Sequence, residues 1–194
     1  FEGGNGSQNN PDLVKTAKQL ARIAYLGKNN KLKNDIYFKQ VADIDLSGKN
    51  WYPIKGTDQD SYISRINYDG NGYDIKNLHI SNINQGMFID CAALFAYSTG
   101  ELKNINMIDV NINAADSNFA APICGYFGGV MKNCYANGKV KGIVSGGLVS
   151  TFYGINGTSA NIIISNCRSD VSVNGDCAGG VTGFFADGQI ENCI

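Results

Sequence analysis

The sequence predicts an all-β solenoid, a parallel β-helix, with a short capping helix at its N-terminal end. A four-residue motif with asparagine in its third position recurs along the chain, which is typical of stacked structural repeats. Glycine and asparagine each occur 24 times in 194 residues, whereas proline occurs three times, so turns are frequent without the composition of a linker or of collagen. Short runs of Val, Ile, Leu, Phe and Tyr between these turns favour β-strands.

Helical periodicity is confined to the N-terminal region. Thr16 and Gln19 have the spacing of a capping box, and apolar residues recur at helical spacing after them. We expect a helix at about residues 16–27, whose apolar stripe covers an open sheet end. The chain then divides into an N-terminal cap, residues 1–46, with this helix and the first strands, and a series of β-helix coils, residues 47–194.

The repeated motif indicates what kind of solenoid this is. Its marker asparagines are Asn77, Asn104, Asn133, Asn166 and Asn192. They are 26 to 33 residues apart, which is too short for four-stranded propeller blades of about 40 residues, and the glycine and β-branched content excludes helical repeats. We predict that these asparagines occupy one corner of successive coils and form a hydrogen-bonded ladder. Asparagine also tolerates the left-handed backbone of a sharp corner.

The residue after each marker asparagine is expected to point into the core. These residues are Leu78, Ile105, Cys134, Cys167 and Cys193. For the three cysteines we predict reduced, buried thiols, because stacked neighbouring strands give poor disulfide geometry. The total of six cysteines would otherwise suggest disulfides in a secreted protein, and the state of Cys91, Cys124 and Cys177 stays open. The absence of CxxC spacing argues against structural zinc.

Two stretches, GGLVS at residues 146–150 and GGVTGF at residues 179–184, each lead to an SNC or ENC motif and resemble the GLUG repeat of bacterial surface proteins. The stretches ADIDLSGKNWYPI and YDGNGYDIKNLHI resemble the segment that commonly precedes those repeats. In the first two repeats, small residues or proline replace the glycine pair. The resemblance implies a right-handed parallel β-helix on secreted or wall-attached proteins, including adhesins and the non-catalytic regions of IgA-cleaving metalloendopeptidases. It carries no catalytic residues.

Residues that could carry out catalysis are sparse. His79 is the sole histidine, and its two neighbours are apolar, so strand alternation places it on the outer face as an ordinary surface residue. The three arginines, Arg22, Arg65 and Arg168, are far apart, and no paired-carboxylate motif recurs. We therefore predict that the chain is not an enzyme, with no catalytic or cofactor-binding residue.

Two acidic turns offer oxygen ligands of the kind that calcium prefers. Their residues are Asp58 and Asp60 in the first turn, and Asp69, Asn71 and Asp74 in the second. Neither turn matches an EF-hand loop or the repeats of calcium-binding β-rolls. We expect solvated turns and predict no metal site.

Aromatic residues are concentrated near the expected cap. They are Trp51, Tyr52, Tyr62, Tyr68 and Tyr73. Such side chains can stack on a sugar ring or anchor a partner protein. The favoured role is packing of the cap onto the first coils, so no ligand-binding residue is assigned.

Charge and hydropathy limit the partners. Sixteen basic and seventeen acidic residues are scattered singly, so nucleic acid is not expected to bind, and no segment is apolar enough to enter a membrane. The chain opens without a signal segment and stops just after a fifth motif, so we expect a piece of a longer protein.

The main hypothesis is a non-catalytic extracellular module of a bacterial adhesin-like protein, secreted or attached to the cell wall, whose partner is an extracellular protein or glycan. One alternative is the non-catalytic region of a secreted metallopeptidase. The other is a carbohydrate-active β-helix enzyme.

Overall fold

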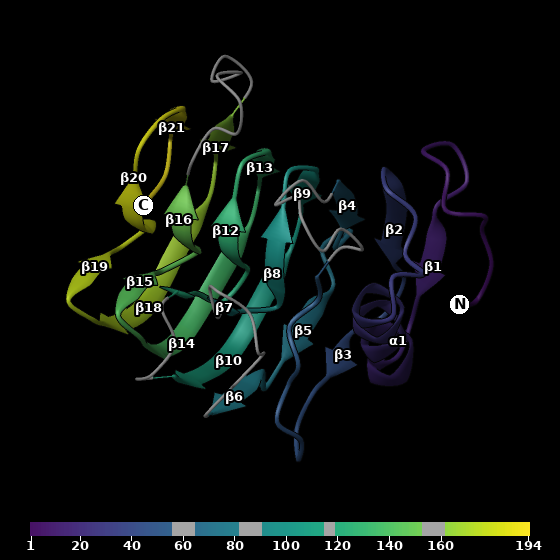
Figure 1. Ribbon diagram of the computed structural model, residues 1–194, viewed down its shortest axis with the longest axis horizontal. Helices are drawn as coiled ribbons and strands as arrows, with labels where there is room; N and C mark the ends of the chain where they lie inside the picture. Colours follow the sequence, from purple (N-terminus) through teal and green to yellow (C-terminus); the bar gives the residue numbers. More distant parts are fainter. Residues whose placement is uncertain (56–64, 82–90, 115–118, 153–161) are drawn as a thin grey trace.

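Parallel strands stack coil on coil into a solenoid, whose N-terminal end is on the right and whose last coil is on the left in Figure 1. The computed structural model describes residues 1–55, 65–81, 91–114, 119–152 and 162–194. Within these ranges, every pairing between named strands is parallel. The predicted all-β parallel β-helix with a short N-terminal helix is confirmed.

Two long sheets form most of the solenoid wall. The strands of the first sheet are β1 (Asp12–Val14), β2 (Ile36–Gln40), β4 (Ile66–Asp69), β9 (Glu101–Lys103), β13 (Val130–Lys132), β17 (Ile163–Ser165) and β21 (Gln189–Glu191), hydrogen-bonded in that order. The strands of the second sheet are β3 (Ile44–Asp45), β5 (Asp74–Lys76), β6 (His79–Ser81), β10 (Asn106–Asn113), β14 (Tyr135–Lys141) and β18 (Arg168–Asn174). Its order is β18-β14-β10-β5-β3, with β6 also paired to β10.

Two shorter sheets complete the coils. The strands of the third sheet are β7 (Cys91–Ala92), β11 (Phe119–Ala120), β15 (Val144–Gly146) and β19 (Cys177–Gly179). The strands of the fourth sheet are β8 (Phe95–Ser98), β12 (Cys124–Phe127), β16 (Val149–Phe152) and β20 (Thr182–Phe185). Strands β2 and β3, which precede residue 46, belong to the same sheets as the later coils. The division at residue 46 stays a prediction.

Helix α1 (Ala17–Lys28) lies at the N-terminal end of the solenoid (Figure 1), about where the sequence predicts it. The hydroxyl of Thr16 accepts a hydrogen bond from the Gln19 amide at 3.2 Å, and the Gln19 side chain accepts one from the Lys15 amide at 2.7 Å. These bonds satisfy amides that have no partner inside the helix. Its buried residues are Leu20, Ile23, Ala24 and Gly27.

The core consists of rows of inward side chains, one from each coil. In the first sheet this row is Phe38, Tyr68, Leu102, Met131 and Ile164, all at most 2% exposed. Burying an apolar side chain of this size stabilises a fold by about 1.5 to 3 kcal/mol. Because side chains alternate along a strand, the residues on either side of this row face outward.

Four of the five marker asparagines occupy the predicted corner, directly after strands of the first sheet. They are Asn104, Asn133, Asn166 and Asn192, with φ between 51° and 54°. Nδ2 of Asn133 donates to Oδ1 of Asn104 at 3.3 Å, and Asn192 donates to Asn166 in the same way at 3.3 Å. Within the described ranges, no such bond joins Asn166 to Asn133. The left-handed conformation is confirmed, but the ladder is two separate pairs.

The prediction that Asn77 begins this series is wrong. Strand register pairs Asp69 with Lys103, which places Gly70 next to Asn104 in the stack, and the Gly70 amide donates to the Lys103 carbonyl at 2.8 Å. Asn77 lies between β5 and β6, and its Nδ2 donates to an oxygen of Asp45 at 2.9 Å.

The assignment of Asn77 is wrong for a physical reason. The backbone also turns in a left-handed conformation at a second position of these coils. Asn77 has φ 60° and Asp109, in the next coil, has φ 56°. The Asn77 amide donates to the carbonyl of Ile108 at 2.9 Å, so the two positions are neighbours in the stack. Leu78 is fully buried as expected, but at this second corner and not in the stack that contains Ile105.

The first glycine of each pair in the last two repeats lies where the backbone is crowded. A Cβ atom at Gly146 would lie 1.7 Å from the carbonyl oxygen of Val149, and one at Gly179 would lie 2.0 Å from that of Thr182. Both glycines end strands of the third sheet, directly before the turn into the fourth. The repeat therefore requires glycine at these two positions, because the neighbouring backbone leaves no space for a side chain.

Candidate functional site

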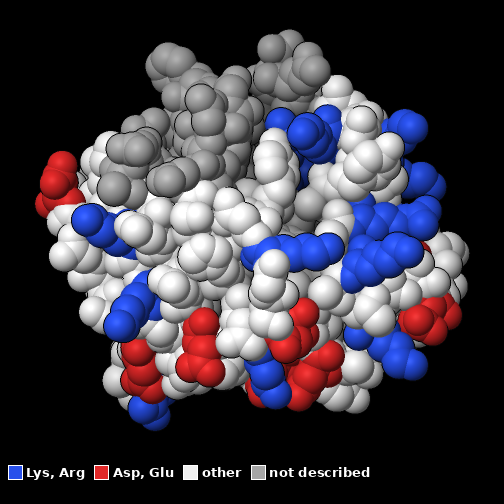
Figure 2. Space-filling view, turned by 90° about the horizontal axis from the view of Figure 1, so that it is seen from below, with Lys and Arg blue, Asp and Glu red and all other residues white. Residues whose placement is uncertain are grey.

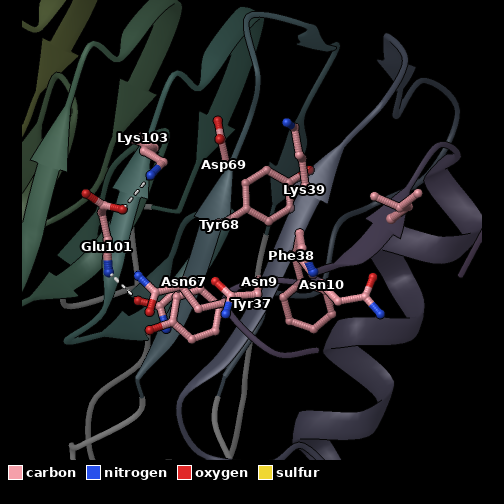
Figure 3. A pocket seen from close by; sticks show the side chains of 13 residues that line it. Asn9, Asn10, Tyr37, Phe38, Lys39, Asn67, Tyr68, Asp69, Glu101 and Lys103 are labelled. Atoms are coloured by element: carbon pink, nitrogen blue, oxygen red, sulfur yellow. Dashed lines mark hydrogen bonds and ion pairs between the residues drawn. The ribbon is translucent and has the colours of Figure 1, made fainter. Parts of the chain in front are cut away.

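A polar groove lies on the outer face of the first sheet, close to the N-terminal end (Figure 3). Its volume is about 400 Å³. The loop at residues 8–11 and the outward side chains of β2, β4 and β9 line it. The lining residues are Gln8, Asn9, Asn10, Pro11, Leu13, Tyr37, Phe38, Lys39, Asn67, Tyr68, Asp69, Glu101 and Lys103.

Strand alternation determines which side chains reach the groove. In β2, Phe38 is buried while Tyr37 and Lys39 on either side are half-buried. The register with β4 places Asn67 beside Tyr37 and Asp69 beside Lys39. The groove floor is thus two outward rows, one beginning at Tyr37 and the other at Lys39.

The N-terminal loop is fixed in position as one wall by backbone hydrogen bonds. Ser7 and Asn10 form an antiparallel bridge, with the Asn10 amide donating to the Ser7 carbonyl at 3.1 Å. The Tyr37 amide donates to the Gly6 carbonyl at 3.0 Å, which ties the loop to β2. Within the part of the chain that the structure describes, no hydrogen bond uses the side chains of Gln8, Asn9 or Asn10. Their amides are therefore available to a ligand.

One cation and one carboxylate in the groove neutralise each other. Nζ of Lys103 lies 2.7 Å from Oε2 of Glu101, and this hydrogen bond raises the pKa of the lysine. The Glu101 amide donates to Oδ1 of Asn67 at 2.9 Å, and Nδ2 of Asn67 donates to an oxygen of Asp35 at 3.2 Å. These bonds hold the far end of the groove in one geometry.

The other two charged side chains of the groove, Asp69 and Lys39, differ in their hydrogen bonding. Oδ1 of Asp69 accepts from the Asn71 amide at 2.8 Å and from Nδ2 of Asn104 at 2.9 Å. Lys39 forms no ion pair or hydrogen bond through its side chain among the described residues. The groove thus offers amides, an unpaired ammonium group and the side chain of Tyr37, which suit non-covalent binding of a hydroxyl-rich ligand.

Most of the aromatic residues near the cap serve the core. Trp51 is 8% exposed and its Nε1 donates to the Leu94 carbonyl at 3.2 Å. Tyr68 is 1% exposed and its hydroxyl donates to the side chain of Gln40 at 3.1 Å. Tyr52 packs against the core, Tyr73 is exposed, and Tyr62 lies outside the described residues. Packing is thus the role of Trp51 and Tyr68.

The structure separates the other residues singled out in the sequence. His79 is half-buried on β6 between the fully buried Leu78 and Ile80, as strand alternation predicts. Asp58 and Asp60 lie outside the described residues. No three His, Cys, Asp or Glu side chains lie together at metal-binding distance in the described ranges.

None of the six cysteines, which all lie in the described ranges, forms a disulfide. Cys134 and Cys167 are each 2% exposed, as predicted, and the Cys134 thiol donates to the Lys132 carbonyl at 3.3 Å. The prediction of a buried Cys193 is wrong, because Cys193 belongs to the last coil and is half-buried. Of the remaining three, Cys91 and Cys124 are buried and Cys177 is exposed.

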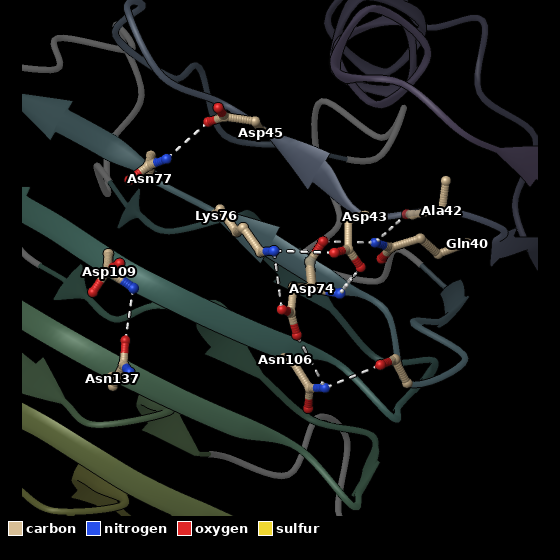
Figure 4. Close-up of polar contacts among 11 residues, drawn as sticks. Gln40, Ala42, Asp43, Asp45, Asp74, Lys76, Asn77, Asn106, Asp109 and Asn137 are labelled. Carbon is tan, nitrogen blue, oxygen red and sulfur yellow. Dashed lines mark hydrogen bonds and ion pairs between the residues drawn. The ribbon is translucent and has the colours of Figure 1, made fainter.

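A second polar cluster joins β3 and β5 on the second sheet (Figure 4). Nζ of Lys76 lies 3.0 Å from an oxygen of Asp43 and 3.3 Å from one of Asp74. The Asp74 amide also donates to Asp43 at 3.0 Å. This amide and then Lys76 lower the pKa of Asp43, so its carboxylate is structural.

The chain resembles parts of two larger proteins, although no family model matches it. A "Putative Gly-rich membrane protein" of Evansella cellulosilytica is 32% identical over 113 residues, which cover 55% of this chain and 12% of that protein. The crystal structure of a "putative immunoglobulin A1 protease" from Bacteroides ovatus has a TM-score of 0.82 and 26% identity, over 100% of this chain and 59% of that chain. In the described ranges, no helix is long and apolar enough to cross a membrane. The chain therefore shares its solenoid fold with a region of the larger Bacteroides protein.

Proposed function

We propose that the chain is a non-catalytic, extracellular β-helix module of a bacterial adhesin-like surface protein, secreted or attached to the cell wall. The observation that carries the proposal is the polar groove, where the unpaired amides of the loop at residues 8–11 lie beside the ammonium group of Lys39 on β2. The likeness to the Bacteroides protein and to a relative named as a membrane protein supports a place at the cell envelope.

The groove favours a glycan over a protein as the partner. Protein interfaces usually centre on buried aromatic or arginine anchors, whereas the groove has half-buried Tyr37 and the exposed amides of Asn9 and Asn10. Amide groups both donate and accept hydrogen bonds, as sugar hydroxyls require, and a tyrosine ring can pack on a sugar face.

The groove carboxylates support a non-catalytic role. Glycoside hydrolysis uses two carboxyl groups, one of which donates a proton while the other acts as base or nucleophile. Here Glu101 is paired with Lys103, and one oxygen of Asp69 accepts two hydrogen bonds. Both carboxylates are thus already engaged by groups of this chain, whereas glycoside hydrolysis needs a pair of carboxyl groups that face the scissile bond.

A glycan array followed by titration tests this proposal. We expect a defined set of bacterial or host glycans to bind, and the variant Asn9→Ala/Asn10→Ala/Lys39→Ala to lose affinity about tenfold or more, because hydrogen bonds to neutral and charged groups are removed. The matched control is Lys139→Ala/Asn174→Ala, on β14 and β18, which should keep wild-type affinity. Equal affinity of both variants would remove the groove from the proposal, and absence of any bound glycan would contradict a glycan partner.

A second candidate is the non-catalytic region of a secreted protease, favoured by the likeness that covers all of this chain and 59% of the Bacteroides protein. In that case the module would bind immunoglobulin without cleaving it. Incubating the purified chain with IgA1 separates the cases, because binding without cleavage supports this candidate. Turnover of IgA1 or of a polysaccharide, lost in Glu101→Gln, would instead establish an enzyme.

A further inference from the structure

The N-terminal end of the solenoid carries a strongly basic surface, here called the basic cap. It consists of Lys15, Lys18, Arg22, Lys28, Lys31 and Lys33, all exposed. No aspartate or glutamate occurs between residues 13 and 34. The whole chain has 16 basic and 17 acidic residues, so this segment is far more basic than the chain as a whole. Among the described residues, the carboxylate nearest to the helix in hydrogen-bonding terms is that of Glu2, which accepts from Nε2 of Gln19 at 3.1 Å and pairs with no cation of the cap.

Packing of α1 determines which way these cations point. The helix buries Leu20, Ile23, Ala24 and Gly27 against the solenoid. Lys18, Arg22 and Tyr25 have the spacing i, i+4, i+7, so they share the opposite face over about 10 Å of helix. Tyr25 is 60% exposed in this row. The helix therefore presents an aromatic ring beside two cations to the solvent.

The charge of the basic cap is not neutralised within the described residues. Five ion pairs occur there, and none includes a cation of the cap. Arg22 lies 5.7 Å from the ring centre of Phe1, and Lys28 lies 5.0 Å from that of Tyr52. Such contacts orient a cation and leave its charge in place. Figure 2 shows Lys and Arg side chains gathered towards this end of the molecule.

We infer that the basic cap is a binding surface for an anionic polysaccharide, separate from the groove. The inference rests on the proposed extracellular location, where such polymers are met. The helix cannot insert into a bilayer as an amphipathic anchor does, because its apolar face is already buried. The exposed Tyr25 in one row with Lys18 and Arg22 suits a chain of acidic sugars, since its ring can pack on a sugar while the cations pair with carboxylates.

Binding of the purified chain to polygalacturonate tests the inference, with dextran as the uncharged polymer. We expect binding to polygalacturonate alone, with affinity falling about tenfold or more from roughly 50 to 500 mM NaCl as salt screens the charges. The variant Lys18→Glu/Lys31→Glu/Lys33→Glu should lose this binding. It avoids Arg22 and Lys28, whose contacts with aromatic rings contribute to packing.

The matched control, Lys132→Glu/Lys139→Glu/Lys141→Glu, reverses the charge of three exposed lysines on the sheets. It changes the net charge of the protein by the same amount as the cap variant. Its loss of affinity should be at least about fivefold smaller than that of the cap variant. Equal losses, no binding by the wild-type chain, or tighter binding to phosphatidylglycerol vesicles than to polygalacturonate would overturn the inference. The groove variant Asn9→Ala/Asn10→Ala/Lys39→Ala separates the proposals, because it should retain most binding to polygalacturonate.

Discussion

Nδ2 of Asn133 donates to Oδ1 of Asn104 across 3.3 Å, and both residues have φ 53°. The hydrogen bond joins exposed side chains, so its net contribution to stability is about 0.5 to 1 kcal/mol. A left-handed conformation costs an ordinary residue about 1 to 2 kcal/mol. Asparagine is therefore needed at this corner at least as much for its backbone conformation as for the bond.

The first prediction separates these two contributions at Asn133. Asn133→Ala should lower the free energy of unfolding by about 1 to 2 kcal/mol, because alanine adopts the left-handed conformation poorly. Asn133→Gly should cost less, since glycine adopts it freely. Urea unfolding measures both, with Asn174→Ala at an exposed strand position as control. Equal losses for the alanine and glycine variants would assign the effect to the side-chain bond.

A second prediction concerns Gly27 in α1. Alanine is the better helix former by about 1 kcal/mol, yet a Cβ atom here would lie 1.8 Å from the carbonyl oxygen of Lys55. Gly27→Ala should therefore destabilise the protein, by about 1 to 3 kcal/mol as overpacked sites do. Thermal or urea unfolding measures the change in stability. The variant Ala21→Gly, on the exposed face of the helix, reports the effect of helix propensity alone. A more stable Gly27→Ala variant would refute the close approach.

Thiol reactivity provides a third prediction. Burial raises the pKa of the Cys134 and Cys124 thiols, which keeps them protonated at neutral pH, whereas Cys177 is exposed. Iodoacetamide should alkylate Cys177 first in the native protein, then half-buried Cys193, and Cys134 only after unfolding. Mass spectrometry of tryptic peptides follows each site. Alkylation of Cys134 as fast as of Cys177 would contradict the packing of the core.

Acid sensitivity provides a fourth prediction. The pKa of Asp43 lies below its ordinary value of 3.8 because the Asp74 amide and then Lys76 donate to the carboxylate. A group with a lowered pKa stabilises the fold above its unfolded pKa, and this contribution is lost as the pH falls through the folded value. The urea concentration at the midpoint of unfolding should therefore fall as the pH is lowered below about 4. It should fall less in the variant Asp43→Asn. Asp176→Asn, at an exposed position of the last coil, is the control and should follow the wild type.

Features set by local sequence could be predicted, because their cause lies within a few residues. Thr16 and Gln19 begin α1 through their own side chains, and Asn133 has the same left-handed conformation as Asn104 and Asn166 in the adjacent coils. The assignment of Asn77 failed because a second left-handed corner occurs in the coils of Asn77 and Asp109. Only strand register, which pairs Asp69 with Lys103, shows which corner a motif occupies.

The groove and the basic cap depend on tertiary arrangement. Tyr37, Asn67 and Glu101 are about thirty residues apart and meet only through the register of three strands. The polar, outward positions of β2, β4 and β9 are visible in the sequence, but the loop that closes the groove is held by the bond from the Tyr37 amide to Gly6. The basic cap is visible as a local run of cations, which a chain-wide charge count averages away.

The direction of the interstrand hydrogen bonds has a mechanical consequence. These bonds run from coil to coil along the solenoid, and the first and last coils lie at its opposite ends (Figure 1). A pulling force between the ends would load the bonds along their own length and open them ladder by ladder. The seven-residue ladder between β14 and β18 should resist this peeling more than the three-residue ladder between β17 and β21. Under tension, the module should therefore lengthen in coil-sized steps.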